Sequence, residues 1–151
     1  MSSVQAYAYP GWGEWAEKNL RYTQAVRVGD TIILSGQGGW DARRSEYELE
    51  KDFIKKDLVA EIDEAFANVD YALKHAGGKG WSQVYRVVTY STDIPSQSEH
   101  IVANFRKWMP NHCPVWTQLG VSHLGSKQMH FEIDVEAYDE EGAAEARKAK
   151  K

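Results

Sequence analysis

The stretch CPVWTQLGVSHLGSKQMHFEIDVEAY, residues 113–138, decides the fold because its second half has the pattern of a two-faced β-strand. From Met129 onward, apolar residues alternate with other residues at the period of two that strand geometry imposes. The apolar positions are Met129, Phe131, Ile133, Val135 and Ala137, and the positions between them are His130, Glu132, Asp134, Glu136 and Tyr138. We predict that one face of this strand packs in a core and that the other is solvated or functional.

Composition restricts the class of protein. The chain has 151 residues, with 18 basic and 22 acidic side chains and a formal charge of −4. This length is typical of one domain. A net negative charge argues against nucleic acid as a partner, because affinity for nucleic acid comes largely from clustered Lys and Arg. The single cysteine, Cys113, cannot form an internal disulfide, and there is no leader-like or membrane-spanning apolar run. We expect a soluble, cytoplasmic protein with no membrane partner.

The elements expected elsewhere complete the domain. Two β-rich runs, 22–28 and 31–36, flank Gly29-Asp30, a pair typical of a type II′ hairpin. Apolar residues at steps of three and four predict a helix over 57–76, and a β-branched run predicts a strand over 84–92. An S-x-x-E capping box at 96–99 predicts a second helix that ends before Pro110. Strands over 115–121 and 128–138 finish the fold.

This order, β-β-α-β-α-β-β, predicts an α+β fold in which two helices cover one face of a mixed sheet. The other face stays open, and six Trp and eight Tyr favour a ligand site or packing of that face against copies of the chain. We assign residues 22–138 to the domain. Residues 1–21 are expected to form an arm draped on it, and residues 139–151 a charged, flexible tail.

The glycines after the first hairpin leave two interpretations open. Residues 35–41 contain Gly36, Gly38 and Gly39 but match neither a Walker A loop nor the Rossmann pattern. The glycines provide either unusual backbone angles or a close approach of the backbone to a bound oxygen. Ser35 lacks the context of a nucleophile elbow. The five histidines, at 75, 100, 112, 123 and 130, show no metal-ligand spacing, so we expect no metal.

Four segments together resemble the RidA/YjgF reactive-intermediate deaminase family, also labelled endoribonuclease L-PSP. They are YTQAVRVGDTIILSGQ (22–37), ANVDYALKHAG (67–77), VVTYSTD (87–93) and FEIDVEAY (131–138). The resemblance implies a chorismate-mutase-like fold and a homotrimer whose sheets form an inner barrel, with a cleft between each pair of subunits. It also implies hydrolysis of reactive enamines or imines, released by pyridoxal-phosphate enzymes, to a keto acid and ammonia without a cofactor.

The same resemblance assigns site residues. Tyr22, Ser35 and Gly36 match positions that line the cleft, and Glu132 matches the acid that positions or activates water. For the neighbouring acids Asp134 and Glu136 we expect a solvated or subunit-contact role. A carboxyl group desolvated in a trimer interior would have a raised pKa and so be useful near neutral pH.

One segment departs from the family pattern. Members with deaminase activity carry an arginine in a P-x-R-[ST] segment, where it binds the substrate carboxylate as a bidentate pair. Here residues 114–117 read PVWT, so Trp116, followed by Thr117, stands where the arginine belongs. An indole offers an N–H donor and an apolar plate but no counter-charge for an anion. Trp116 is therefore either a core residue or an aromatic platform for a flat, neutral ligand. Arg86, Arg106 and Lys107 are candidates to reach in from a neighbouring subunit and replace the missing cation.

Three functions remain open from the sequence. The first is cofactor-independent hydrolysis of a small enamine or imine, with Glu132 handling water or protons. The second is non-catalytic binding of an apolar or aromatic metabolite. The third is a lyase or isomerase recruited to biosynthesis for a neutral or aromatic substrate. A ribonuclease activity is the least favoured, because the chain has an acidic balance and no basic stripe.

Overall fold

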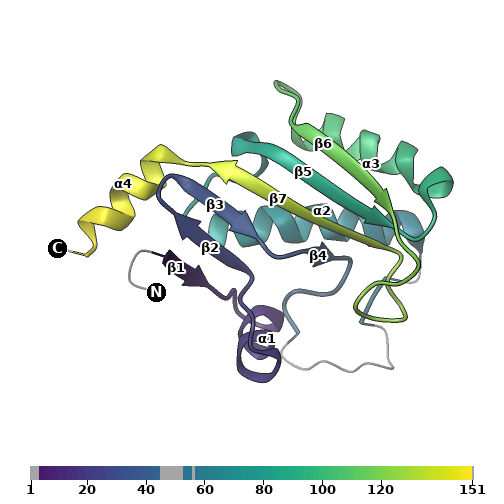
Figure 1. Cartoon of the computed structure of the whole chain (residues 1–151), viewed down its shortest axis with the longest axis horizontal. Helices are drawn as coiled ribbons and strands as arrows, with labels where there is room; N and C mark the ends of the chain where they lie inside the picture. The colour runs from purple at the N-terminus through teal and green to yellow at the C-terminus, as the bar shows by residue number, and fades with distance from the viewer. Residues whose placement is uncertain (1–3, 45–52, 56, 151) are drawn as a thin grey trace.

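The computed structural model describes residues 4–44, 53–55 and 57–150, and Figure 1 shows their arrangement. The strands are β1 (Val4–Tyr7), β2 (Ala25–Val28), β3 (Thr31–Leu34), β4 (Gln37–Gly38), β5 (Val84–Ser91), β6 (Val115–Gly120) and β7 (Phe131–Tyr138). The helices are α1 (Trp12–Leu20), α2 (Leu58–His75), the short 3-10 helix η1 (Trp81–Gln83), α3 (Ile94–Trp108) and α4 (Glu140–Lys148).

One sheet organises the chain, with β7 near its centre. The strand order is β1-β2-β3-β7-β5-β6, and β4 continues beside β7 along the same edge as β3. The β5–β6 pair is parallel and the other pairs are antiparallel. The mixed sheet and the core order β-β-α-β-α-β-β are thus confirmed, and β1, β4, α1 and α4 are added to them.

The hairpin between β2 and β3 has the predicted turn. Val28 pairs with Thr31, which leaves Gly29-Asp30 as a two-residue loop. Gly29 has a φ of 59°, and Arg21 is the only non-glycine residue with a positive φ in the described ranges, so Asp30 lies on the negative side. A positive φ at the first position alone is what a type II′ turn requires.

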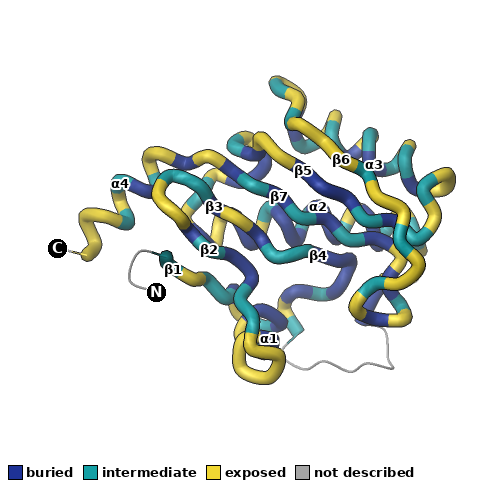
Figure 2. The backbone as a smooth tube through the Cα atoms, in the orientation of Figure 1, coloured by how far each residue is buried: buried dark blue, intermediate teal, exposed yellow. Residues whose placement is uncertain are grey.

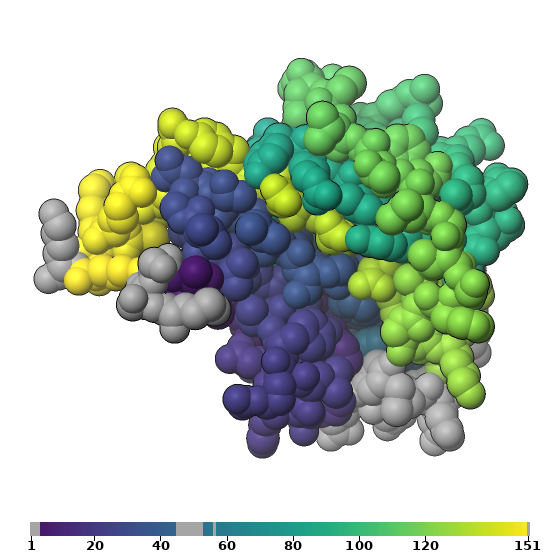
Figure 3. Space-filling view, viewed as in Figure 1, coloured from purple at the N-terminus to yellow at the C-terminus, as the bar shows by residue number. Residues whose placement is uncertain are grey.

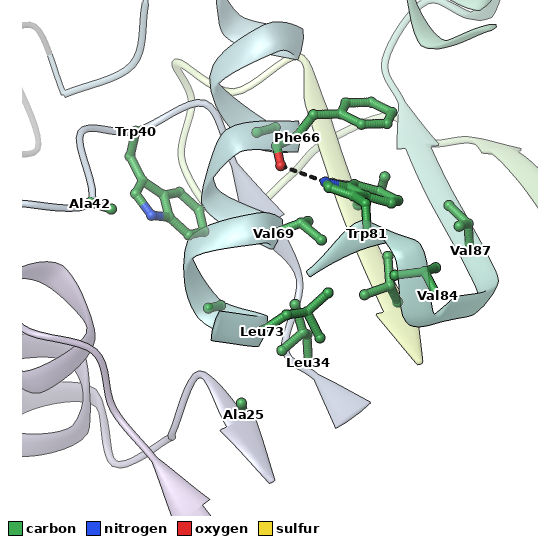
Figure 4. Packing of buried hydrophobic residues seen from close by; sticks show 14 of the residues in the cluster. Ala25, Leu34, Trp40, Ala42, Phe66, Val69, Leu73, Trp81, Val84 and Val87 are labelled. Carbon is green, nitrogen blue, oxygen red and sulfur yellow. Dashed lines mark hydrogen bonds between the residues drawn. The ribbon is translucent and has the colours of Figure 1, made fainter. Parts of the chain in front are cut away.

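The core lies between the sheet and the helices α2 and α3, which cover one face of it (Figure 1). The inward positions of β7, namely Phe131, Ile133, Val135 and Ala137, are at most 1% exposed. Figure 4 shows side chains of α2 packed toward the η1 segment, where the Trp81 indole N–H donates to the Phe66 carbonyl at 2.9 Å. The apolar alternation in β7 therefore reports burial against α2, as expected of a two-faced strand.

The helices α2 and α3 begin at different N-terminal capping signals. Asp57 caps α2 as its position suggests, with its side chain accepting from the Ala60 N–H at 2.8 Å. The capping box predicted at 96–99 is wrong, because α3 already begins at Ile94, with Asp93 at the N-cap and Pro95 in the first turn. Proline fits there because the first turn needs no N–H from it.

Segments near both ends of the chain form regular structure. The N-terminal arm contributes to the fold: β1 pairs with β2, and Trp12 of α1 is only 3% exposed. The expectation of a frayed tail is wrong for residues 140–148, which form α4. The Asp139 side chain caps α4 by accepting from Gly142 N–H, and it pairs with the buried Arg27 guanidinium at 2.7 Å. That buried pair fixes α4 on β2.

The face of the sheet that α2 and α3 do not cover is open in the single chain, as predicted for a sheet with both helices on one side. Figure 2 shows β6 exposed along most of its length, whereas β7 alternates between buried and less buried positions. Large apolar side chains on this open face include Val28, Ile33, Val115, Leu119 and Tyr138. None of the helices in the described ranges combines the length and apolar character needed to cross a bilayer.

Candidate functional site

Two of the three acids on the open face of β7 are paired. Arg86 of β5 places Nη1 3.4 Å from a Glu136 oxygen and 3.8 Å from an Asp134 oxygen. The Tyr90 hydroxyl donates to Asp134 at 2.9 Å, and the Tyr85 hydroxyl donates to Glu136 at 2.6 Å. A shared cation and one hydroxyl donor each give these two carboxylates a structural role.

Glu132 lies on the same face and differs from both. Among the described residues, no group donates a hydrogen bond to its carboxylate and no cation pairs with it. Its side chain is half-buried. Burial raises the pKa of the Glu132 carboxyl, and the negative charge of Asp134 raises it further. A carboxyl shifted in this direction exchanges protons closer to neutral pH than an ordinary glutamate does.

Gly36 lies directly against this carboxylate. A Cβ at position 36 would overlap the Glu132 side chain. Gly36, Gly38 and Gly39 are not among the glycines with positive φ in the described ranges. Unusual backbone angles therefore do not explain these glycines, whereas close packing does. Ser35 is fixed beside it, because its hydroxyl donates to the Thr23 carbonyl at 2.7 Å.

Four of the six predicted site residues, Tyr22, Ser35, Gly36 and Glu132, line one cavity of about 590 Å³. Small-molecule sites typically span roughly 300–1,000 Å³. The other described lining residues are Trp12, Trp15, Leu20, Trp40, Phe53, Gly125, Ser126 and Met129. In Figure 3, α1 in purple and the loop between β6 and β7 in yellow-green stand on either side of this region.

Aromatic side chains form one side of the cavity, which we call the aromatic wall: Trp12, Trp15, Trp40 and Phe53. The Trp12 ring is central to it, with centroid distances of 5.2 Å to Trp15, 5.7 Å to Trp40 and 4.9 Å to Phe53. Trp40 and Phe53 stack at 6.0 Å with 16° between their planes. The wall is thus one continuous aromatic surface.

Buried hydrogen bonds hold the aromatic wall in place. The Trp40 indole N–H donates to the Tyr9 hydroxyl at 3.2 Å, and that hydroxyl donates to the Gln37 side-chain oxygen at 2.9 Å. The backbone N–H of Trp12 donates to the Ala42 carbonyl at 2.9 Å, which ties the start of α1 to the loop after β4. Because Gln37 belongs to β4, the wall is anchored to the sheet that carries Glu132.

Trp116 and Thr117 do not line this cavity within the chain. They lie on β6, which β5 separates from β7. The Trp116 indole N–H donates to the Thr89 hydroxyl at 2.9 Å, and its ring meets Phe105 edge-on at 5.0 Å. Trp116 therefore packs toward α3 and remains 36% exposed. A role for Trp116 and Thr117 at a cleft between subunits stays a prediction.

Within the single chain, the candidate replacements for the missing arginine also lie away from this cavity, and their role from a neighbouring subunit stays a prediction. Arg86 is engaged by Asp134 and Glu136, and Arg106 and Lys107 are exposed on α3. Of the described residues that line the cavity, none is Lys, Arg or His. In the part of the chain that the structure describes, no three His, Cys, Asp or Glu side chains are grouped as a metal site requires.

The aromatic wall is the part of the site that sequence reasoning did not locate. The abundance of Trp and Tyr indicated a ligand site or an interface, but residues 1–21 were expected to form only an arm draped on the domain. The available signal was the spacing of Trp12 and Trp15, which places two indoles on one helical face. The structure shows that the arm does reach the cavity.

Comparison with known proteins agrees with the fold. The sequence matches the family described as endoribonuclease L-PSP over residues 16–139. The chain belongs to this RidA/YjgF/L-PSP family. It is 33% identical over 117 residues to the RutC family protein YjgH of Escherichia coli K12, covering 76% of this chain and 80% of that protein. The resemblance seen in the sequence is confirmed.

Solved structures of the RidA/YjgF/L-PSP family share the fold. A structure of protein YjgH has a TM-score of 0.74 at 26% identity, covering 92% of this chain and 98% of that one. RidA from an Antarctic Psychrobacter has a TM-score of 0.69 at 24% identity, covering 90% and 98%. The family match begins at residue 16, after Trp12 and Trp15. The aromatic wall is therefore built partly from outside the matched region.

Proposed function

We propose that this protein hydrolyses a small enamine or imine to a carbonyl compound and ammonia in the cavity around Glu132. The observation that carries the proposal is the half-buried Glu132 carboxylate, held against Gly36 without a partner among the described residues. Membership of a family that includes enamine and imine deaminases supports the reaction class. Tyr22 and Ser35, which line the same cavity, are the proposed orienting groups.

The chemistry needs one group that accepts and returns a proton. Glu132 takes a proton from water as the water oxygen bonds to the imine carbon, and the protonated carboxyl gives that proton to the nitrogen, which forms a carbinolamine. Glu132 then takes the carbinolamine hydroxyl proton and passes it to the nitrogen as the C=O bond forms and the C–N bond breaks with its electron pair leaving on nitrogen, so the products are a carbonyl compound and ammonia. A raised pKa suits Glu132 to both steps, because the proton affinities of donor and acceptor are then better matched. No redox change occurs in either step.

We also propose that the working unit is a homotrimer whose open sheet faces pack together around the three-fold axis. The support is the large apolar side chains on that face, such as Ile33 and Leu119, beside carboxylates already neutralised by Arg86. Exposed apolar surface of this kind marks an interaction face. In such a trimer the edge strand β6, with Trp116 and Thr117, would border the cleft of a neighbouring subunit.

A second candidate is non-catalytic binding of an aromatic metabolite. The aromatic wall and the lack of a cation among the described lining residues favour it. The two functions differ in turnover, since a binding protein would retain the ligand unchanged.

Ammonia release from freshly generated short-chain imines tests the reaction. We expect the wild-type protein to accelerate release, and Glu132→Gln to lose about 10²–10⁴-fold, the usual contribution of a general acid–base group. Glu136→Gln is the matched control, because it removes a carboxylate from the same face of β7 outside the cavity. Undiminished acceleration by Glu132→Gln, or none by wild type, would contradict the proposal.

A further inference from the structure

We propose that the substrate of this site carries an aromatic or similarly broad apolar group and no carboxylate, with its nitrogen directed at Glu132. The assignment as a substrate rests on the proposed imine hydrolysis. The ligand preference itself rests on the cavity alone.

The aromatic wall defines the apolar part of the ligand. Its four rings form a continuous surface, anchored through Trp40, Tyr9 and Gln37 to the sheet. A preformed aromatic surface binds a flat ring without paying for its own reorganisation. Trp12, Trp40 and Phe53 are at most 4% exposed, so the half-buried Trp15 provides most of the ring surface open to a ligand. A ligand with its own ring can stack on that indole, which a small aliphatic imine cannot do.

Charge defines the polar part of the ligand. Glu132 is the one ionisable acid or base among the described lining residues apart from the Tyr22 phenol, and none of these residues is a cation. A ligand carboxylate would be desolvated beside a like charge with no counter-charge, which is strongly unfavourable. A protonated imine or amine would instead pair with Glu132 and gain attraction from the ring faces. An uncharged imine would avoid the repulsion as well.

Residues 114–117 provide no cation either. Trp116 stands where the resemblance led us to expect a carboxylate-binding arginine. Its indole N–H is already engaged by Thr89 and its ring by Phe105, so it is built into the packing against α3. Arg86, a cation on the open face, is engaged by two acids. An anion-binding group is therefore missing both from the segment and from the cavity lining that the structure describes.

Trp15 is the residue best suited to test the wall. It lines the cavity but is only half-buried, whereas Trp12 is 3% exposed and belongs to the core. Trp15→Leu should therefore alter the ligand surface without unfolding the protein. Trp108→Leu is the matched control, because Trp108 is also half-buried but lies on α3 outside the cavity.

Calorimetric titration of the full-length protein tests the ligand preference. The probes are 2-phenylethylamine, 2-phenylacetamide, phenylacetate and ethylamine, which vary the charge and the ring separately. We expect 2-phenylethylamine to bind at least about tenfold more tightly than phenylacetate and ethylamine. The affinity for 2-phenylacetamide should lie between those for 2-phenylethylamine and phenylacetate. Glu132→Gln should remove most of the charge preference, and Trp15→Leu should weaken the phenyl probes by about tenfold while Trp108→Leu does not.

Turnover separates this inference from the proposed reaction. The matched substrates are the imines of 2-phenylethylamine and of phenylalanine, generated in place by an amine oxidase and an amino-acid oxidase, because they differ only in the carboxylate. Faster hydrolysis of the first supports both proposals. Faster hydrolysis of the second, or tighter binding of phenylacetate, overturns the substrate class and leaves the deaminase intact. The expected binding order without hydrolysis of either imine overturns the reaction, and the substrate assignment with it, and leaves an amine-binding cavity.

Discussion

Glu132 and its neighbours Asp134 and Glu136 occupy the same face of the same strand, yet two of these carboxylates have hydrogen-bonding and charged partners and one does not. Asp134 and Glu136 share Arg86, and each accepts a tyrosine hydroxyl. Glu132, two residues along the strand, faces a largely apolar cavity without a partner among the described residues. The difference teaches that a row of acids in a sequence does not have one role. The partners decide, and those of Asp134 and Glu136 all come from β5.

A fourth acid, Asp139, gives the largest expected effect and sharpens the contrast. Burial alone would raise the pKa of its carboxyl, but hydrogen bonds from Arg27, Gln83 and the Gly142 N–H, with the charge of Arg27, bring the net pKa below its ordinary value. Asp139→Ala leaves the Arg27 guanidinium, which is 5% exposed, without its counter-charge. We therefore expect a loss of about 3 kcal/mol in the free energy of unfolding. Chemical denaturation measures it.

Asp30→Ala is the control for that variant, because Asp30 pairs with Arg147 at the surface at 3.2 Å. A surface pair should contribute less than about 1 kcal/mol. Since the folded-state pKa of Asp139 is lowered, its stabilisation is present above the unfolded pKa and is lost as pH falls through the folded one. The stability difference between wild type and Asp139→Ala should therefore shrink below about pH 4. Equal losses in both variants would contradict the buried pair.

Gly36→Ala should shift the position of the Glu132 carboxylate while leaving its charge unchanged. The added methyl would overlap the carboxylate and displace it, and a misplacement of about 1 Å is enough to cost roughly 100-fold in rate. Gly125→Ala is the control, because Gly125 also lines the cavity but a Cβ there meets nothing within 4 Å. Imine hydrolysis by both variants measures the effect. Full activity in Gly36→Ala would show that the close approach is not needed.

Glu132→Gln should change stability in the opposite direction to Asp139→Ala. Because the folded-state pKa of Glu132 is raised, its ionisation destabilises the fold as pH rises through that pKa. The amide should therefore stabilise the protein at pH 7 by on the order of 1 kcal/mol, near the low end of the cost of an unsatisfied buried polar group. The gain should vanish below about pH 4, where glutamate is protonated in both states. Thermal unfolding at the two pH values tests this, with Glu136→Gln as the comparison.

Asp134→Asn gives the smallest expected effect and tests the coupling within the row. The charge of Asp134 contributes to the raised pKa of Glu132. Removing that charge should lower the pKa of Glu132, so the acid limb of the pH–rate profile should move to lower pH by less than about one pH unit. A shift to higher pH would show that the two carboxylates are not coupled as described.

Sequence reasoning was most successful where a residue's role follows from its own strand or turn. The alternation in β7, the Gly29-Asp30 turn and the family segments predicted the core, and the structure brings Tyr22, Ser35, Gly36 and Glu132 to one cavity. The aromatic wall was not predicted, because it forms only when α1, β4 and the segment at Phe53 meet in space. The helix α4 was not predicted for a related reason. Asp139 caps it while bound to Arg27, which is 112 residues away in the sequence.

The position of α1 has a consequence for how this fold can diversify. Trp12 and Trp15 come from a helix of nine residues at the edge of the domain, and both precede the part of the chain that matches the family. Glu132 and the central sheet lie within the matched part, as do Trp40 and Phe53 of the aromatic wall. Under the proposed function, ligand preference could therefore change through substitutions in α1 while the strand that carries Glu132 stays the same.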